Sequence, residues 1–420
     1  ASFGSAEKQR LLRQNSRLLS QRYPGFDAEV RGFVAADPLV TARLALGLSL
    51  VADRADESVP VWLAHAMGGG AENDLRDRIA ARTAADQAGV VVRIGQGKRW
   101  KLELHTAQGK TAAVSDAFEP VAALIARLPR RRIIYSCGVG DRDPAALPGF
   151  LLALAGRGSG AIPGGAQPLE VLLHDYFPIS PSYTLLGKAG VWRGVPRPDT
   201  VAGNDPAHCW TGPGGAEVDL AAWQAGWGAM LEAADRIEVF SAASGAILSQ
   251  AYPHVGGIVV REHRLPSRPP HLTPGPVTGD QPVIGILGNI GPHKGARIVQ
   301  QLSRDLARSG AARLVVIGRV APEYALASWA HVHGPYQIRD LPGLVARYGI
   351  SAWLIPSVWP ETFSFTTHEA LATGLPVLAF DLGAQGAAVE AAENGIALPC
   401  PGSRGLDPGA VLAALRESAP

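Results

Sequence analysis

The sequence predicts an α/β protein built from two doubly wound domains that face each other across a cleft. Two strand–loop–helix–strand units support this fold, one over residues 59–94 and the other over residues 283–317. Strands that alternate with helices indicate a parallel sheet covered by helices on both faces. Between the two units, residues 261–282 contain six prolines, a composition typical of a stiff linker between domains.

The N-terminal segment, residues 1–58, is expected to be a helical extension. Leucines recur there at a seven-residue interval, as Leu11, Leu12, Leu18 and Leu19, with Arg and Gln between them. This spacing predicts an amphipathic helix. We expect its apolar side to pack on its own domain, and the alternative is contact with a further domain or protein.

The first domain is predicted over residues 59–262. It begins with a strand at Val59–Ala64, a Gly-rich turn, a helix at Ala71–Gln87 and a strand at Val90–Ile94. Further strands of the parallel sheet are predicted at Trp100–Leu104, Ile133–Ser136, Glu170–His174 and Ile237–Phe240. The Trp- and Gly-rich segment 178–215 has little periodicity, which indicates a long surface loop.

The second domain is predicted over residues 283–420, after a Pro-rich linker at 263–282. A loop at Gly288–Lys294 and a helix at Ala296–Arg308 follow its first strand. The strands themselves are predicted at Val283–Leu287, Leu314–Ile317, Ala352–Ile355 and Val377–Phe380. Ligands of such sheets bind outside the carboxyl ends of the strands, so we expect a site in the cleft.

Charge, cysteine content and hydropathy limit the partners and the cellular location that we expect. The net charge of +2 argues neither for nor against a polyanionic partner, and we expect no nucleic acid among the partners. Three widely spaced cysteines favour a reducing compartment over a disulfide framework. No run reaches the roughly 18 apolar residues of a membrane helix, and the N-terminus lacks the pattern of a signal peptide. We therefore expect a cytoplasmic protein, with a peripheral position at the inner face of the cell membrane as the alternative.

Two glycine-rich turns predict a phosphate site. The stretch Gly288–Gly295 (GNIGPHKG) follows a strand and runs into a helix, where free N–H groups and Lys294 attract an anion. Its residue order differs from that of a Walker A loop and from GxGxxG. Glycines 68–70 occupy the same position in the first domain. An ordinary turn with a surface lysine is the alternative interpretation.

A histidine and an aspartate follow another buried strand. His174 and Asp175 come directly after Leu173, so we expect both at the cleft. A histidine there can polarise a hydroxyl of a sugar, and the alternative is a histidine hydrogen-bonded to the neighbouring loop.

Two glutamates flank the start of a helix in PETFSFTTHEALATGLPVLAF. Glu361 lies before the expected helix start near Ser364, and Glu369 lies one to two turns into the helix. Carboxylates at two such points suit two polyol groups of one ligand, with a phosphate at the helix N-terminus between them. The alternative for Glu369 is a capping box over Thr366–Glu369.

Asp141-Arg142-Asp143 is a D-x-D sequence, a pattern that elsewhere binds a metal and a nucleotide. Asp143-Pro144 reads instead as the N-cap and first residue of a helix, so we expect no metal there.

Taken together, these motifs resemble the retaining glycosyltransferases of family 4, which have the GT-B fold of two Rossmann-like domains. The strongest match is Glu361-x7-Glu369, which is similar to the E-x7-E signature of that family. The Gly288–Gly295 loop and the GGGAE stretch at Gly68–Glu72 are further matches, and the resemblance covers residues 59–399. HAMGGGAE and LLHDYFPISPSY are similar to members that build bacterial cell-surface polysaccharides.

The resemblance implies a transfer of a sugar from a nucleotide-diphosphate donor to a glycan or lipid-linked acceptor. It implies a hexosyl-type, metal-independent enzyme without a further cofactor, in which His174, Asp175 and Glu361 form the catalytic group. The donor-binding residues that it implies are Gly69, Gly70, Asn289, Lys294, Phe363, Ser364, Phe365, Thr366 and Glu369. Among these, Glu369 is expected on the ribose hydroxyls and Lys294 on the diphosphate.

One position departs from the family pattern. Asn289 stands where the family has an arginine five residues before the lysine, and Arg319 is the cation that could replace it. Together with the atypical N-terminal segment, Asn289 motivates an alternative function. In that alternative the protein is a catalytically weak or inactive GT-B module that binds sugar nucleotide or scaffolds a larger glycan-assembly protein. A third hypothesis is a sugar-nucleotide epimerase, and the pair of Glu361 and Glu369 argues against it.

Overall fold

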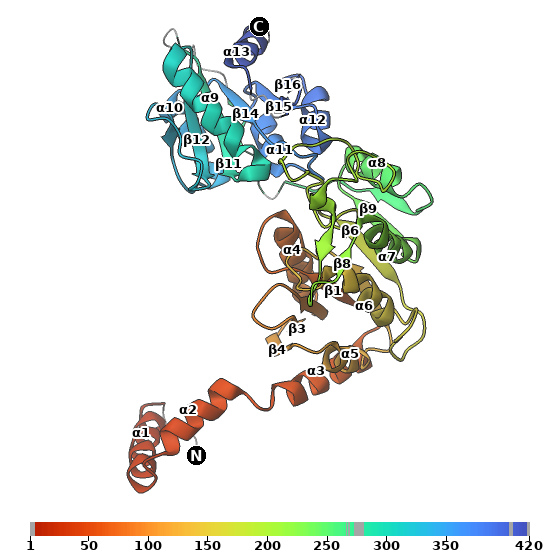
Figure 1. The fold of residues 1–420 in the computed structure, drawn as a ribbon. Coiled ribbons are helices and arrows are strands. Elements are labelled where there is room, and N and C mark those ends of the chain that lie inside the picture. Colours follow the sequence, from red (N-terminus) through yellow and green to blue (C-terminus); the bar gives the residue numbers. More distant parts are fainter. Residues whose placement is uncertain (1–4, 266, 268, 273–280, 403–405, 418–420) are drawn as a thin grey trace.

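The computed structural model describes residues 5–265, 267, 269–272, 281–402 and 406–417. Two separate sheets lie one above the other, and each is covered by helices (Figure 1). The first sheet uses strands up to residue 260, and the second begins at residue 283. Much of the predicted linker, including Pro266, Pro274 and Pro276, lies outside the described residues.

The first domain contains an eight-stranded sheet with the order β10-β9-β6-β5-β1-β2-β3-β4. Six strands are parallel: β1 Val59–Ala64, β2 Gly89–Arg93, β5 Arg131–Tyr135, β6 Leu169–Leu173, β9 Arg236–Val239 and β10 Ile258–Val260. Its helices are α4 Gly70–Ala84, α5 Phe118–Ile125, α6 Leu147–Leu154, α7 Leu220–Glu232 and α8 Ala242–Ala251. Strand β1 is buried along its whole length, as expected for the centre of a parallel sheet.

The edge of this sheet corrects the expectation of an all-parallel arrangement. Strands β3 (Trp100–Thr106) and β4 (Gly109–Ser115) form an antiparallel hairpin, and β3 also pairs antiparallel with β2. Only two residues separate β3 from β4. Such a short turn can join antiparallel strands, whereas parallel neighbours need a long crossover.

The irregular segment before α7 also differs in part from the prediction. It contains a 3-10 turn at Pro206–His208 and a small hairpin of β7 (Trp210–Thr211) and β8 (Glu217–Val218). Ile179, Ser180 and Leu185 are buried, so the segment packs into the domain rather than lying wholly on its surface.

The second domain has a six-stranded, fully parallel sheet with the order β13-β12-β11-β14-β15-β16. Its strands are β11 Val283–Ile290, β12 Arg313–Val320, β13 His331–Val332, β14 Ala352–Ile355, β15 Val377–Phe380 and β16 Gly395–Leu398. Its helices are α9 Ala296–Ser309, α10 Leu341–Tyr348, α11 Phe365–Ala372, α12 Gly383–Glu390 and α13 Pro408–Glu417. Because the strand order reverses between β11 and β14, the loops after these strands meet at the point where ligands bind in such sheets.

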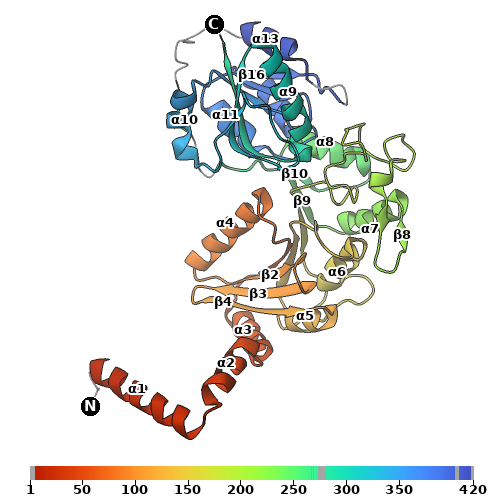
Figure 2. The same cartoon turned by 60° about the vertical axis from the view of Figure 1, so that its left-hand side comes forward.

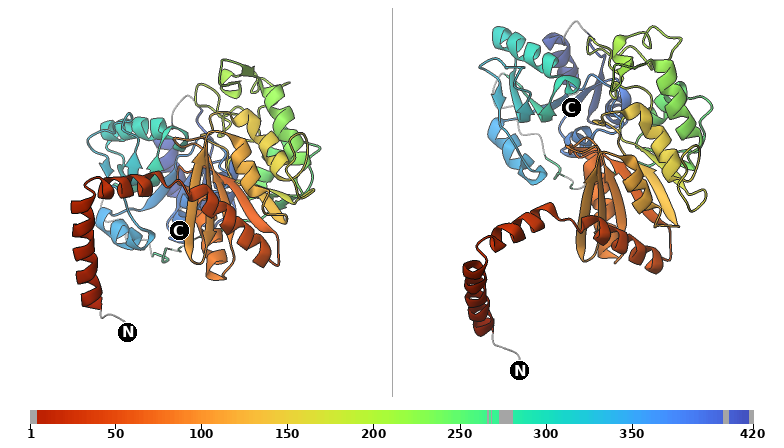
Figure 3. Two further views of the ribbon diagram at one scale, coloured as in Figure 1. Left: turned by 90° about the horizontal axis from the view of Figure 1, so that it is seen from below. Right: turned by 60° about the horizontal axis from the view of Figure 1, so that its bottom comes forward.

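The N-terminal helices correct the expectation that the Leu-rich helix packs on its own domain. Helices α1 (Ser5–Arg22) and α2 (Phe26–Ala36) extend away from the body of the protein (Figures 1, 2 and 3). Leu12 and Leu18 are 57% and 56% exposed. Only α3 (Val40–Arg54) joins the first core, where Leu44 and Leu48 are buried.

No single helix in the described ranges is both long and apolar enough to cross a membrane. The bent pair of α2 and α3, with 47° between them, passes that test by length and composition alone.

Candidate functional site

A cavity of about 200 Å³ lies where the carboxyl ends of the two sheets face each other. Segments from both domains form its wall: the start of α4, the end of β6, the chain after β10, the turn after β11, and the loop between β14 and α11. The residues that line it are Gly70, Ala71, His174, His263, Lys294, Trp359, Glu361, Thr362, Phe363, Phe365 and Thr366.

The N-termini of two helices open into this cavity. Helix α4 contributes Gly70 and Ala71, and helix α11 contributes Phe365 and Thr366. The first N–H groups of a helix have no partner within the helix and carry partial positive charge. Two such ends at one cavity favour a negatively charged ligand.

Glycine is required where the first domain reaches the second. Gly69, the residue before α4, has φ 88° and ψ −168°, a conformation essentially limited to glycine. A Cβ atom on Gly70 would lie 2.9 Å from Cε2 of Phe365 in the other domain. The glycines therefore allow the start of α4 to approach α11 closely.

Lys294 and Glu361 form an ion pair on the second-domain side of the cavity. Nζ of Lys294 lies 2.7 Å from Oε2 of Glu361, although the two residues are 67 positions apart. The Glu361 side chain is 3% exposed, and its Oε1 is buried without a hydrogen-bond partner among the described residues. A buried carboxylate oxygen without a donor faces a site where a ligand hydroxyl could donate.

The backbone around this ion pair is held in place by local structure. The 3-10 turn Pro292–Lys294 ends at Gly295, which has φ 82° and whose added Cβ would lie 2.0 Å from the carbonyl oxygen of Pro356. On the other side, the amide of Glu361 donates to Oε1 of Gln385 at 3.0 Å. The two loops after β11 and β14 are thus fixed to each other and to α12.

His174 lies at the cavity as predicted. Its carbonyl oxygen accepts a hydrogen bond of 2.7 Å from Oγ1 of Thr362, which links the two domains. Its Nε2 faces Oδ2 of Asp74 on α4, 3.5 Å away. Burial alone would raise the pKa of Asp74, but its interaction with His174 and the charge of Arg78 lower it to about 2.

Sequence reasoning missed a second histidine, His263. Its ring stacks on Phe240 with 3.8 Å between centroids and contacts Phe363 and Phe365 of the second domain. Burial lowers the pKa of His263 to about 4, so the ring is neutral at physiological pH. The residue opens the segment predicted as a linker, and no local motif marks it. Trp359 and Asp74 were missed for the same reason.

Asp175 is not brought to the cavity with His174. Its carboxylate accepts hydrogen bonds from Sγ of Cys137 at 3.0 Å and from the amide of Phe177 at 2.8 Å. Burial raises the pKa of Asp175. Successive residues at the end of a strand point to opposite sides, so one of the two neighbours faces inward.

Glu369 lies outside the cavity wall, one turn beyond Phe365 on α11. Its carboxylate has no hydrogen bond or ion pair within the described chain, and burial raises its pKa to about 7. The helix begins after Ser364, and the reciprocal bonds of a capping box are absent at Thr366–Glu369. The structure therefore excludes the capping interpretation of Glu369.

The remaining predicted donor residues divide into two groups. Phe363, Phe365 and Thr366 line the cavity, whereas the hydroxyl of Ser364 is buried and accepts from Oγ1 of Thr367 at 2.8 Å. Asn289 was expected in a loop, but β11 continues to Ile290 and leaves Asn289 exposed. Its partner across the parallel strands is Arg319, which is also exposed.

The D-x-D sequence has a structural role. Asp143 precedes Pro144 as predicted, but the element that follows is a 3-10 turn and the Asp143 side chain makes no capping hydrogen bond. The Asp141 side chain is fully buried and pairs with the guanidinium of Arg99 at 2.8 Å.

Comparisons with known proteins agree with this architecture. Residues 281–416 match the family described as Glycosyl transferases group 1. Sucrose-phosphate synthase from Thermosynechococcus elongatus has a similar structure, with a TM-score of 0.53, 16% identity, and coverage of 86% of this chain and 89% of that one. HepE from Anabaena in complex with UDP gives a TM-score of 0.51 and 15% identity, with 86% and 90% covered. No curated protein sequence matches the chain.

These likenesses establish the fold, which is GT-B: two Rossmann-like domains with a cleft between them. The segment that matches the glycosyltransferase family is the second domain, which carries Lys294, Glu361 and Glu369.

Proposed function

We propose that this protein is a retaining glycosyltransferase that moves a sugar from a nucleotide-diphosphate donor to an acceptor. The observation that carries the proposal is the Glu361 carboxylate. One oxygen pairs with Lys294, and the other is buried without a donor within the described ranges. An unsatisfied buried acceptor costs about 1–3 kcal/mol, and a sugar hydroxyl that enters the cavity would remove this cost.

The surroundings of Glu361 suit a diphosphate next to that sugar. Lys294 and the N-termini of α4 and α11 bring positive charge to the cavity from both domains. Lysine binds phosphate as a point charge, and helix N-termini bind it through N–H groups. A single ligand that carries both hydroxyls and a diphosphate satisfies Glu361 and the positive charges together.

The size of the cavity suggests which part of the donor lies inside it. At about 200 Å³ the cavity is smaller than the roughly 300–1,000 Å³ of usual ligand sites. We infer that it takes the sugar and diphosphate, and that the nucleoside lies outside, along α11. Glu369 is four residues beyond Phe365, hence on the same helix face and about 6 Å further along the axis. This position suits hydrogen bonds from the ribose hydroxyls.

The proposed reaction breaks the bond between the anomeric carbon and the diphosphate oxygen. A bond from the acceptor hydroxyl forms on the same face of the sugar, and the hydroxyl proton passes to the leaving diphosphate. Lys294 and the helix N–H groups stabilise the charge that develops on the diphosphate. Glu361 acts by positioning the sugar, because its ion pair with Lys294 already engages one oxygen.

We further propose that the reaction requires no metal ion, because Lys294 and the two helix ends supply the positive charge that a diphosphate needs. Transfer that continues at an unchanged rate in excess chelator is the expected result, and loss of activity that Mg²⁺ restores would contradict it.

The first experiment is a thermal-shift series with UDP, ADP and GDP, followed by hydrolysis of the matching sugar donors. UDP is the first probe because the similar structure of HepE contains it. We expect one nucleotide to raise the melting temperature, and we expect Lys294→Gln, but not the exposed control Lys188→Gln, to abolish the shift. If no nucleotide shifts the melting temperature, the proposal is refuted.

The second candidate function is a GT-B module that binds sugar nucleotide without transferring the sugar. Asn289 favours it, because an amide cannot neutralise charge as an arginine does. The parallel pairing of Asn289 with Arg319 offers a replacement cation on the next strand. Stabilisation by a nucleotide without hydrolysis of any sugar donor would favour the binding module.

We propose a cytoplasmic protein that works at the inner face of the membrane, on a glycan or lipid-linked acceptor of cell-surface polysaccharide synthesis. Helix α1 carries five basic residues and one acidic residue in addition to its exposed leucines. Basic amphipathic helices bind anionic bilayer surfaces. Co-sedimentation with vesicles that contain anionic lipid, lost on deletion of residues 1–36, is the expected result. Equal sedimentation without these residues would contradict it.

A further inference from the structure

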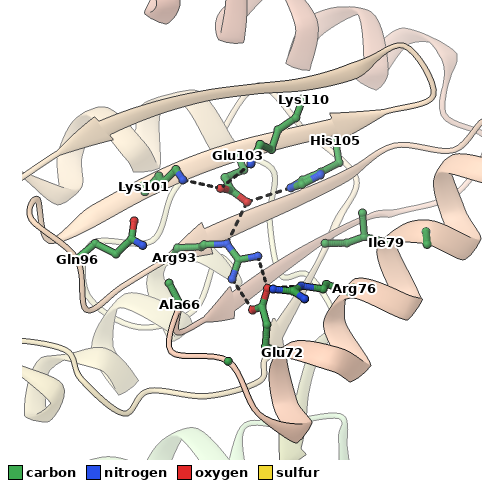
Figure 4. A pocket seen from close by; sticks show the side chains of 12 residues that line it. Ala66, Glu72, Arg76, Ile79, Arg93, Gln96, Lys101, Glu103, His105 and Lys110 are labelled. Atoms are coloured by element: carbon green, nitrogen blue, oxygen red, sulfur yellow. Dashed lines mark hydrogen bonds and ion pairs between the residues drawn. The ribbon is translucent and has the colours of Figure 1, made fainter. Parts of the chain in front are cut away.

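A second, larger pocket lies on the first domain beside the Gly-rich turn. Its volume is about 410 Å³. Figure 4 shows that charged side chains from α4 and from the β2–β4 edge of the sheet point into it. The pocket and the donor cavity are separated by a single turn of chain, because Gly68 lines the pocket and Gly70 lines the cavity.

The polar wall of this pocket follows from the alternation of β3. Trp100, Leu102 and Leu104 point to the core and are buried. The residues between them, Lys101, Glu103 and His105, point to the other face, as strand geometry requires. The antiparallel register adds Lys110 opposite His105 and Arg93 opposite Lys101 on the same face.

Glu103 is the centre of the charge cluster on this face. It is almost fully buried and accepts hydrogen bonds from Nε of Arg93 at 3.0 Å and from Nζ of Lys110 at 3.5 Å. It also forms an ion pair with Nζ of Lys101 at 2.9 Å, and Nε2 of His105 lies 3.0 Å from its carboxylate. Burial would raise the pKa of Glu103, but these hydrogen bonds hold it well below its usual range. Glu103 therefore remains a carboxylate that fixes the surrounding cations.

Arg93 connects this cluster to the start of α4. Its guanidinium donates to both oxygens of Glu72, at 2.6 and 3.1 Å, and to the carbonyl of His65 at 2.8 Å. Nε of Arg76 also donates to Glu72, at 3.1 Å. The network thus fixes the Gly-rich turn between the pocket and the donor cavity, and Arg93 is fully used by it.

The pocket nevertheless keeps an excess of positive charge. Four Lys and Arg side chains face two carboxylates, so two positive charges remain uncompensated even with His105 neutral. Lys101, Lys110 and Arg76 keep 27%, 49% and 68% of their side-chain surface exposed, and these are the groups that a ligand can reach. A phosphate monoester carries about −1.5 to −2 at pH 7, which matches this excess.

We propose that this pocket binds a phosphate group of the acceptor substrate through Lys101, Lys110 and Arg76. The identification of the ligand as an acceptor rests on the proposed glycosyltransferase function. The phosphate site itself rests only on the charges and the volume of the pocket. Because Gly68 lines this pocket and Gly70 lines the donor cavity, an acceptor held there lies next to the donor cavity. A sugar phosphate and a phosphate-linked lipid share this chemistry, and the experiment separates them.

Binding is measured by calorimetry with UDP present at saturation, so that the donor cavity is filled. Glucose 6-phosphate and glucose form the soluble pair of probes, and farnesyl phosphate and farnesol in detergent form the lipid pair. We expect one phosphate probe to bind and its neutral counterpart not to bind. The Lys101→Gln/Lys110→Gln variant should weaken that binding at least about tenfold, because two charged contacts are lost.

The matched control is Lys188→Gln/Arg304→Gln, which removes the same charge from exposed positions elsewhere. It should bind the phosphate probe like the wild type. Arg76→Gln, at the most exposed of the three cations, repeats the test if the double variant does not fold. Equal binding by variant and control, or binding of neither phosphate probe, would overturn the proposal.

The two proposals fail separately. UDP affinity should be the same in the wild type, the double variant and its control, because Lys101 and Lys110 lie outside the donor cavity. If UDP does not bind, the probes are titrated without it in a Lys294→Gln background. Binding that depends on Lys101 and Lys110 would then uphold the phosphate site and refute only the donor site.

Discussion

Glu369 makes a quantitative prediction, because burial raises its pKa from 4.5 to about 7. Between these values the folded protein holds a proton that the unfolded chain has lost, so the free energy of unfolding falls as the pH rises from 4.5 to 7. The difference of roughly 2.5 pKa units corresponds to at most about 3 kcal/mol. Glutamine does not ionise, so Glu369→Gln removes this cost. The free energy of unfolding of the variant, compared with that of the wild type, should therefore increase by up to about 3 kcal/mol between pH 4.5 and pH 8.

The assay is urea unfolding of the wild type and Glu369→Gln at pH 4.5, 6 and 8. The control Glu390→Gln removes an exposed carboxylate of the same domain and should keep the pH dependence of the wild type. If Glu369→Gln also keeps that dependence, the burial of Glu369 has no energetic effect and the reasoning is refuted.

The same carboxylate gives a test of ligand contact. Ribose hydroxyls that donate to Glu369 would favour its ionised form and lower its pKa on binding. UDP binding at pH 6.5 should then release protons, and UDP affinity should rise as the pH approaches 7. Calorimetry in two buffers with different ionisation enthalpies measures the release. Binding without proton release, or with the same release in Glu369→Gln, would show that Glu369 does not contact the nucleotide.

Three further predictions concern residues in the donor cavity and next to it. Glu361→Gln keeps the size of the side chain but weakens hydrogen bonds to the sugar, so donor hydrolysis should fall at least about tenfold while UDP still binds. Gly295→Ala should destabilise the second domain by about 2 kcal/mol or more in chemical unfolding, because its φ is 82° and the new Cβ meets the carbonyl of Pro356. The control Gly343→Ala places its Cβ in open space and should not destabilise the domain. Asp175→Asn should lower the melting temperature without changing the rate constant of donor hydrolysis, and a selective loss of that rate would restore a catalytic role for Asp175.

Glu361, in the loop between β14 and α11, shows how much could be predicted from the sequence. Glu361 was placed at the cleft because it follows a buried strand of a parallel sheet, and all such strands end at one edge. The same argument located Lys294, His174 and Gly70, and the family resemblance added Phe365; all four line the cavity. It failed for Asp175, because adjacent residues at a strand end face opposite sides and packing decides which one faces inward.

The sequence by itself determined the alternation of strands and helices, the division near the prolines, and the turns where only glycine is allowed, because these depend on neighbouring residues. Tertiary structure decided that Lys294 meets Glu361, that His263 joins the cavity, and that the β3–β4 edge forms a pocket of about 410 Å³ with α4. Each of these pairs side chains far apart in the chain. Periodicity fixes which face a residue takes within its own element, but only the packing of elements fixes which residues it meets.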